Sequence, residues 1–225
     1  MVPPRPPTPD PHRPSAHWPS AWWRSVYAQG WFPMADPASG NLQLHRSLRR
    51  GVLPLDERFR LPPSVLRARR QAPWSHRWRL GLNRCFEAVL TDCAARPSTW
   101  ISPELQQVYR QLHADGLVHS VELHDHEGLA AGMLALGIGA CWIGESMAHR
   151  RPDAGNALLV ELVDALRHGG FRLFDVQLSN PHLQRFGCLE IDDRLYRQQL
   201  AQAVARPASL RLQEGAVSSE AWMPE

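Results

Sequence analysis

The sequence contains no lysine, because all 25 of its basic residues are arginine. This excludes a Schiff-base lysine and a phosphate-binding lysine, so cationic chemistry rests on arginine, whose guanidinium fork binds phosphate bidentately. Long apolar runs are absent as well. None reaches the ~20 residues that a membrane-spanning helix needs, since glycines interrupt the most apolar stretch, residues 129–143. We therefore expect no membrane association.

Cysteine is scarce, and none of the four cysteines forms a Cys-x-x-Cys pair. The N-terminal residues also lack the apolar core of a signal peptide. Both observations predict reduced thiols and a cytoplasmic protein. The many prolines of residues 1–19 predict a disordered tail, and the polar residues 206–225 predict a mobile C-terminal tail.

Positive charge is concentrated in one segment. Residues 41–80 hold ten arginines and only two acidic residues, whereas elsewhere acidic residues outnumber arginines by 20 to 15. Such a block is typical of a surface that binds a polyanion. A solvated, helix-rich surface is the alternative.

The order of elements predicts an α+β fold with one main sheet and helices packed on it. We expect a small basic N-terminal domain over residues 20–80 and a second domain over residues 81–205. The second domain should contain, in order, a helix over 102–116, a hairpin of strands 118–124 and 129–137, a strand over 140–143, a turn at 144–147, a helix over 155–168, a strand over 171–178 and a helix over 193–204.

Two carboxylates and a carboxamide fall in segments that otherwise read as buried. Side chains alternate along a strand, so Asp175 and Gln177 should share one face of strand 171–178. Glu145 lies in the Gly-Glu-Ser-Met stretch about thirty residues earlier. Because burial of an unpaired charge is very unfavourable, these groups must be hydrogen-bonded or face a cleft. The pattern favours a site, and a carboxylate that caps a neighbouring loop is the alternative.

Several motifs point to one family. They are Tyr27-x-x-Gly-x-Phe-Pro-Met-Ala, Arg50-Gly-Val-Leu-Pro-Leu-Asp, Trp100-Ile, Tyr109-x-x-Leu-His-x-x-Gly-x-x-His-Ser-Val-Glu, Gly144-Glu-Ser-Met and Asp175-x-Gln with His182-Leu and Gly187. In this order and spacing they resemble the leucyl/phenylalanyl-tRNA–protein transferase family, in its shorter variant with Phe-Pro-Met-Ala. The resemblance covers about residues 27–200.

This resemblance implies an enzyme that moves leucine, phenylalanine or methionine from aminoacyl-tRNA to the N-terminal Arg or Lys of an acceptor protein. The product would be marked for N-degron proteolysis. The family has a small N-terminal domain and a GNAT-like acyltransferase domain, in which helices flank a mixed or antiparallel sheet. No metal or diffusible cofactor is implied.

The resemblance also assigns roles to residues. Asp175 and Gln177 would be catalytic, with Asp175 orienting Gln177 and assisting proton removal while Gln177 positions the amine. Glu145 and Asn180 would bind the acceptor, and the indole of Trp100 would stack on the 3′-terminal adenosine. The tRNA phosphates would be bound by arginines of the basic block: Arg49, Arg50, Arg67, Arg69 and Arg70.

The chain departs from the family's usual pattern at Ala148, where Phe is usual, and at Asn156, where Lys is usual. It also departs near Leu44 and Ser47, where the family usually has an aromatic residue. These departures keep a diverged homologue that binds tRNA or degrons without transfer as one alternative. A GNAT-like N-acyltransferase with an acyl-CoA donor is the other, although we find no Gln/Arg-x-x-Gly-x-Gly/Ala pyrophosphate loop.

Overall fold

A computed structural model describes residues 18–71, 78–95 and 99–210. Most of both predicted tails, residues 1–17 and 211–225, lies outside the described residues. The described helices are α1 Ser20–Ala28, α2 Pro63–Gln71, α4 Phe86–Ala94, α5 Pro103–Ala114, α6 Ala154–His168, α7 Pro181–Gln184 and α8 Asp193–Val204. The described strands are β1 Phe32–Ala35, β2 Leu42–His45, β3 Arg49–Leu53, β4 Arg79–Leu82, β5 Val118–Asp125, β6 Gly128–Ile138, β7 Cys141–His149, β8 Leu173–Gln177 and β9 Leu189–Asp192.

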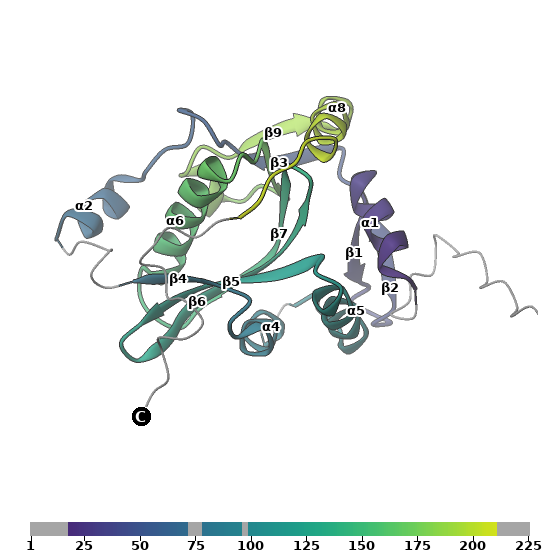
Figure 1. Ribbon diagram of the computed structural model, residues 1–225, viewed down its shortest axis with the longest axis horizontal. Helices are drawn as coiled ribbons and strands as arrows, with labels where there is room; N and C mark the ends of the chain where they lie inside the picture. Colours follow the sequence, from purple (N-terminus) through teal and green to yellow (C-terminus); the bar gives the residue numbers. More distant parts are fainter. Residues whose placement is uncertain (1–17, 72–77, 96–98, 211–225) are drawn as a thin grey trace, which may run out of the picture.

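Seven strands form one sheet in the order β4-β5-β6-β7-β8-β3-β9, and β1 and β2 pair separately (Figure 1). Neighbouring strands are antiparallel except β7 and β8, which are parallel. The predicted α+β class, with a mixed sheet flanked by helices, is therefore confirmed.

The sheet separates two hydrophobic cores. Leu134 and Leu136 of β6 pack with buried residues of α1, α4, α5 and α8. Their neighbours Met133 and Ala135 pack with α6 on the other face (Figure 1). This alternation is the period of a strand that is buried on both faces. The same period places Leu173 in the first core and Phe174 in the second.

Local signals place several helices where the sequence predicts them. Ser102 caps α5, since its hydroxyl accepts a hydrogen bond from the Leu105 amide at 3.3 Å, and Pro103 follows at the first helical position. Asp192 caps α8 through the Leu195 amide at 2.9 Å. The hairpin of β5 and β6 closes at Gly128, whose φ of 111° suits glycine.

The predicted turn at residues 144–147 is wrong. β7 continues through this segment to His149 because β6 supplies a partner along its whole length. A β-bulge interrupts the pairing, since Leu134 faces Ser146 while Ala135 faces Gly144, and Glu145 is the extra residue. The bulge therefore gives Glu145 a position that regular alternation would not.

The predicted domain boundary at residue 80 does not coincide with a boundary of the sheet. β3, from the segment assigned to the N-terminal domain, lies between β8 and β9. The division of the chain into two domains stays a prediction. Among the described residues, no helix combines the length and apolar character that crossing a membrane would demand.

Candidate functional site

A cavity of about 450 Å³ lies where β7 and β8 separate. The two parallel strands are paired only as far as Ile143 and Asp175. Beyond this point β7 stays with β6, while β8 ends in a turn. Glu145 and Gln177, each two residues past the last pair, both line the cavity. The separation of β7 and β8 thus brings together two predicted site residues that are distant in sequence.

Glu145 is buried in the wall of the cavity. The Tyr109 hydroxyl donates a hydrogen bond to its Oε2 at 2.8 Å. Burial raises the pKa of Glu145 to about 7, although Tyr109, Gln177 and Tyr27 partly offset this rise by stabilising the charged form. The carboxyl can therefore exchange a proton near neutral pH.

Asp175 is fully buried and is surrounded by hydrogen-bond donors. Arg50 donates from Nε to Oδ1 at 2.8 Å and from Nη2 to Oδ2 at 2.6 Å. The Tyr196 hydroxyl donates to Oδ2 at 2.6 Å, and the backbone N–H of Gln177 donates to Oδ1 at 2.8 Å. The lining of the cavity does not include Asp175, so this carboxylate acts on the cavity only through Gln177.

Gln177 ends β8 in an unusual conformation. Its φ is 61°, in the left-handed region that non-glycine residues seldom adopt, and the Leu178 amide bonds to the Val176 carbonyl at 2.7 Å across it. Gly51 of β3 lies against this turn, where a Cβ would sit 2.8 Å from the Ser179 nitrogen. Only glycine lets the two backbones approach so closely.

Three buried polar atoms of cavity-lining residues make no hydrogen bond of good geometry among the described residues: Glu145 Oε1, Ser146 Oγ and Gln177 Nε2. The Gln177 side chain nevertheless favours the charged form of Glu145. Leaving such a group unsatisfied costs about 1–3 kcal/mol. A polar ligand that offers a donor to Glu145 and an acceptor to Gln177 would recover this free energy. These atoms are the polar groups that a ligand in the cavity would meet.

The structure brings Asn180 and Trp100 to the same cavity. Asn180 caps the short helix α7, and its Oδ1 accepts from the Leu183 amide at 2.9 Å. This leaves the NH₂ end of the carboxamide for a substrate. Trp100 is half-buried, and its carbonyl accepts a hydrogen bond from Ala35 of β1 at 3.1 Å.

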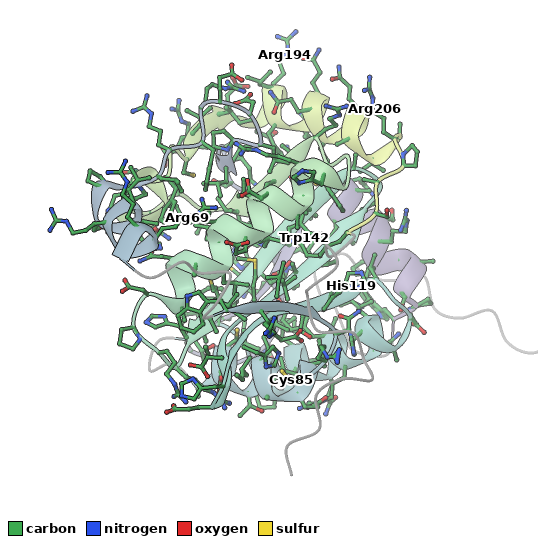
Figure 2. All side chains as sticks on the ribbon, turned by 60° about the vertical axis from the view of Figure 1, so that its left-hand side comes forward. Arg69, Cys85, His119, Trp142, Arg194 and Arg206 are labelled. Carbon is green, nitrogen blue, oxygen red and sulfur yellow. The ribbon has the colours of Figure 1, made fainter. Side chains whose placement is uncertain are left out.

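Four of the five arginines predicted to bind phosphate are exposed. Arg67, Arg69 and Arg70 lie on α2, and Figure 2 shows Arg69 at the periphery of the molecule. Arg49 begins β3. Arg50 does not fit the prediction: its side chain is 1% exposed and pairs with Asp175. Burial opposes its charge, but Asp175 outweighs burial and raises the pKa of Arg50. This guanidinium has no exposed face for a phosphate.

Sequence reasoning missed the tyrosines of the site. Tyr27 and Tyr109 belong to the motifs quoted above, so their presence beside Glu145 could have been suspected. Tyr196 carried no signal, because it reaches Asp175 only through the docking of α8.

A second cavity of about 660 Å³ adjoins the first and shares Met147 and His182 with it. Its lining includes Ala148 and Asn156, two of the departures from the family pattern. Neither lines the cavity of Glu145 and Gln177. These two departures therefore alter a neighbouring surface and leave the paired polar groups in place.

Comparison with known protein families shows to which family the chain belongs. A family model described as leucyl/phenylalanyl-tRNA protein transferase matches residues 52–201. The chain belongs to the leucyl/phenylalanyl-tRNA–protein transferase family. The prediction of an aminoacyltransferase enzyme is thereby confirmed.

Relatives of that name include the protein of Thermosynechococcus vestitus, 46% identical over 181 residues, which are 80% of this chain and 89% of the relative. The Rubrobacter xylanophilus protein is 42% identical over 179 residues, 79% of this chain and 91% of the relative. Similar solved structures are L-PGS from Bacillus licheniformis, with a TM-score of 0.44 at 12% identity over 80% of this chain and 69% of that one, and a GCN5-related N-acetyltransferase from Sphaerobacter thermophilus, with a TM-score of 0.37 at 15% identity over 77% and 54%.

Proposed function

We propose that this protein transfers leucine or phenylalanine, with methionine as a further donor, from aminoacyl-tRNA to the N-terminal Arg or Lys of an acceptor protein. The observation that carries the proposal is the pair of buried groups that make no hydrogen bond of good geometry, Glu145 Oε1 and Gln177 Nε2, on one cavity. An attacking amine offers the donor that Glu145 lacks. A carbonyl oxygen offers the acceptor that Gln177 lacks.

The reaction needs no nucleophilic side chain, because the donor ester is already activated. The α-amino nitrogen of the acceptor forms a bond to the carbonyl carbon of the aminoacyl group, and the carbonyl oxygen becomes an oxyanion. When the oxyanion collapses, the bond to the ribose 3′ oxygen breaks, and that oxygen gains the proton that the amine loses. The enzyme supplies position, an uncharged amine and stabilisation of the oxyanion.

Glu145 would receive the acceptor amine. An α-amino group has a reference pKa of about 7.7–8.0, and a carboxyl whose pKa is raised to about 7 is well matched to accept its proton. The ionised form would also attract the cationic acceptor. We therefore assign proton removal to Glu145 instead of Asp175, to which the family resemblance had led us to assign it. The two oxygens of Asp175 already accept four hydrogen bonds, which supports this change.

Gln177 would donate its Nε2–H to the developing oxyanion and hold the two reactants together. Asp175 would orient Gln177 through the 2.8 Å hydrogen bond that its Oδ1 accepts from the backbone N–H of Gln177. The NH₂ group of Asn180 would bind the acceptor backbone. In this assignment Gln177 and Glu145 touch substrate, and Asp175 is a positioning residue.

The tRNA would approach from the side of Trp100, whose indole would stack on the terminal adenosine. Arg67, Arg69 and Arg70 of α2 would contact phosphates of the acceptor stem, with Arg49 as a further contact. Such contacts are independent of sequence. Charged tRNA and acceptors meet in the cytoplasm, where the product would enter N-degron proteolysis.

The test is transfer of radiolabelled leucine, phenylalanine or methionine from charged tRNA to a peptide that begins with Arg. We expect label in this peptide and none in a matched peptide whose N-terminus is acetylated. Glu145→Gln and Gln177→Ala should each slow transfer strongly. Bound charged tRNA without transfer would instead identify a non-catalytic binding protein, and transfer from an acyl-CoA would identify an N-acyltransferase.

A further inference from the structure

We infer that Arg50 and Tyr196 are positioning residues for the transfer reaction. They fix the carboxylate of Asp175 so that it holds Gln177 in its left-handed conformation, with the carboxamide at the cavity wall beside Glu145. This inference rests on the proposed function. It assigns a role to a residue on β3 and a residue on α8, neither of which lines the cavity.

The carboxylate of Asp175 is immobilised from two sides. Arg50 binds it in a bidentate fork, the geometry that restricts a carboxylate most. Tyr196 adds a hydrogen bond of 2.6 Å to Oδ2. Burial and the negative charge of Asp175 raise the pKa of Tyr196, so the phenol stays protonated and remains a donor.

Arg50 is itself held in place. Its guanidinium carbon lies 4.6 Å from the ring centres of both Phe32 and Tyr196, so it is sandwiched between two aromatic faces. Its Nη1 donates to the Gly30 carbonyl at 3.2 Å. Tyr196 therefore contributes twice, as a ring against Arg50 and as a hydroxyl on Asp175.

Among the donors to the Asp175 carboxylate, the backbone N–H of Gln177 is the one that belongs to a residue of the cavity wall. A non-glycine residue in the left-handed region costs of order 1–3 kcal/mol and persists only when its surroundings determine it. The Asp175 bond and the close contact with Gly51 are those surroundings. If Asp175 could rotate, the Gln177 turn would lose the bond that offsets its strain.

Loss of the Arg50 or Tyr196 contacts to Asp175 should slow the chemical step of the transfer. A displacement of about 1 Å in a reacting group can reduce a rate about a hundredfold, so small rotations of Asp175 matter. Binding of charged tRNA should be unaffected, because Arg50 and Tyr196 are buried away from any surface that a nucleic acid could contact.

The decisive variant is Tyr196→Phe, which retains the ring over Arg50 and removes only the hydroxyl. We expect transfer from charged tRNA to the Arg peptide to slow about tenfold in kcat, which corresponds to a displacement smaller than the ~1 Å that can cost about a hundredfold. KM for the peptide and the affinity for charged tRNA should stay at the wild-type values. Arg50→Lys, which keeps the charge but loses the fork, should be slower than Tyr196→Phe.

Leu200→Val is the matched control, because Leu200 lies one turn after Tyr196 on α8 and is equally buried. It should lower the melting temperature without lowering kcat at a temperature where the protein is folded. Transfer by Tyr196→Phe at the wild-type rate would overturn the inference. So would equal loss of kcat in Tyr196→Phe and Leu200→Val, since the rate would then follow stability. Absence of transfer by the wild type would overturn the proposed function, and this inference with it.

Discussion

Asp175 and Glu145 are buried carboxylates in contrasting surroundings. Asp175 accepts four hydrogen bonds, one pair from an arginine fork, so its charge is fully compensated. Glu145 accepts one of good geometry, from Tyr109, and its Oε1 accepts none among the described residues. Two carboxylates kept apart in this way can divide the work of a site, one as a fixed anchor and one as a titrating group.

The titration of Glu145 should be visible in protein stability. Its pKa is raised from 4.5 to about 7 in the folded protein, so the folded state binds more protons than the unfolded state between these values. Stability is greatest below pH 4.5 as far as this group is concerned, and is lost as pH rises through about 7, by about 3 kcal/mol. Glu145→Gln should remove this decline.

Urea unfolding of the wild type and Glu145→Gln between pH 4.5 and 8 measures this effect. Glu127→Gln, at an exposed carboxylate on the β5–β6 hairpin, is the control. Parallel pH dependence in the wild type and Glu145→Gln would show that the group titrates elsewhere.

Two substitutions of Gln177 should have the same effect on activity but different effects on stability. Gln177→Gly relieves the left-handed conformation, whereas Gln177→Ala retains it, so the glycine variant should be more stable by about 1 kcal/mol. Both variants lack the carboxamide and should lose transfer. Thermal unfolding and the peptide-transfer assay measure the two effects. A glycine variant no more stable than the alanine variant would mean that the turn is not strained.

For single residues, the sequence predicted which side chains lie near one another but not which groups each side chain contacts. Gln177, Glu145, Asn180 and Trp100 line one cavity, and Asp175 is bonded to Gln177 without lining it. The partner of Asp175 was unpredictable, because Arg50 stands 125 residues earlier and reaches it only through the pairing of β3 with β8. Inside a charge-rich segment, a buried arginine looks the same as an exposed one.

Among the elements, α5 and α8 were predicted from local signals, whereas α4 and α7 were not predicted. α7 was missed although Asn180 caps it and Pro181 begins it, because it has only four residues. α5 and α8 carry their own caps. The start of α4 instead depends on Glu122 of β5, whose Oε1 accepts hydrogen bonds from the Arg84 and Cys85 amides. β9 is a mostly exposed strand of four residues that exists because β3 pairs with it. No local pattern encodes either element.

The packing of α4 on the sheet depends on Gly132 of β6. A Cβ at this position would overlap the side chain of Val89, which is fully buried. Gly132→Ala should therefore destabilise the protein by about 1–3 kcal/mol.

Val89→Ala should relieve part of this cost, so the double variant should be more stable than the sum of the two single changes predicts. Urea midpoints of the four proteins measure the coupling. Gly40→Ala controls for loss of a glycine in general, since a Cβ there meets nothing within 4 Å, although its φ of 72° makes it strained. Strict additivity at Gly132 and Val89 would mean that α4 shifts freely to accommodate the methyl group.

For the molecule as a whole, the distribution of arginine predicts how it holds a polyanion. With Arg50 buried, α2 still carries three exposed arginines of the basic block. Replacing Arg67, Arg69 and Arg70 by Gln should weaken binding of charged tRNA. The slope of log affinity against log salt should fall by about 0.7–0.9 for each phosphate that the variant no longer neutralises.

Filter binding at several salt concentrations measures both quantities. Arg206→Gln is the matched control, because Arg206 follows α8 and lies apart from α2 (Figure 2). The triple variant should leave the melting temperature unchanged. Equal salt slopes for the triple variant and the wild type would remove α2 from the tRNA-binding surface.

The order in which β3 acquires its partners has a consequence for synthesis on the ribosome. β3 is made early, yet both of its neighbours in the sheet, β8 and β9, are made near the end. At 5–20 residues per second, the 125 residues between Arg50 and Asp175 take about 6–25 s to translate. Through that interval the nascent chain carries an unpaired strand and an arginine that has no carboxylate to meet. The hairpin of β5 and β6 can form in the meantime, so we expect the half of the sheet that bears the site to be the last part of the newborn protein to close.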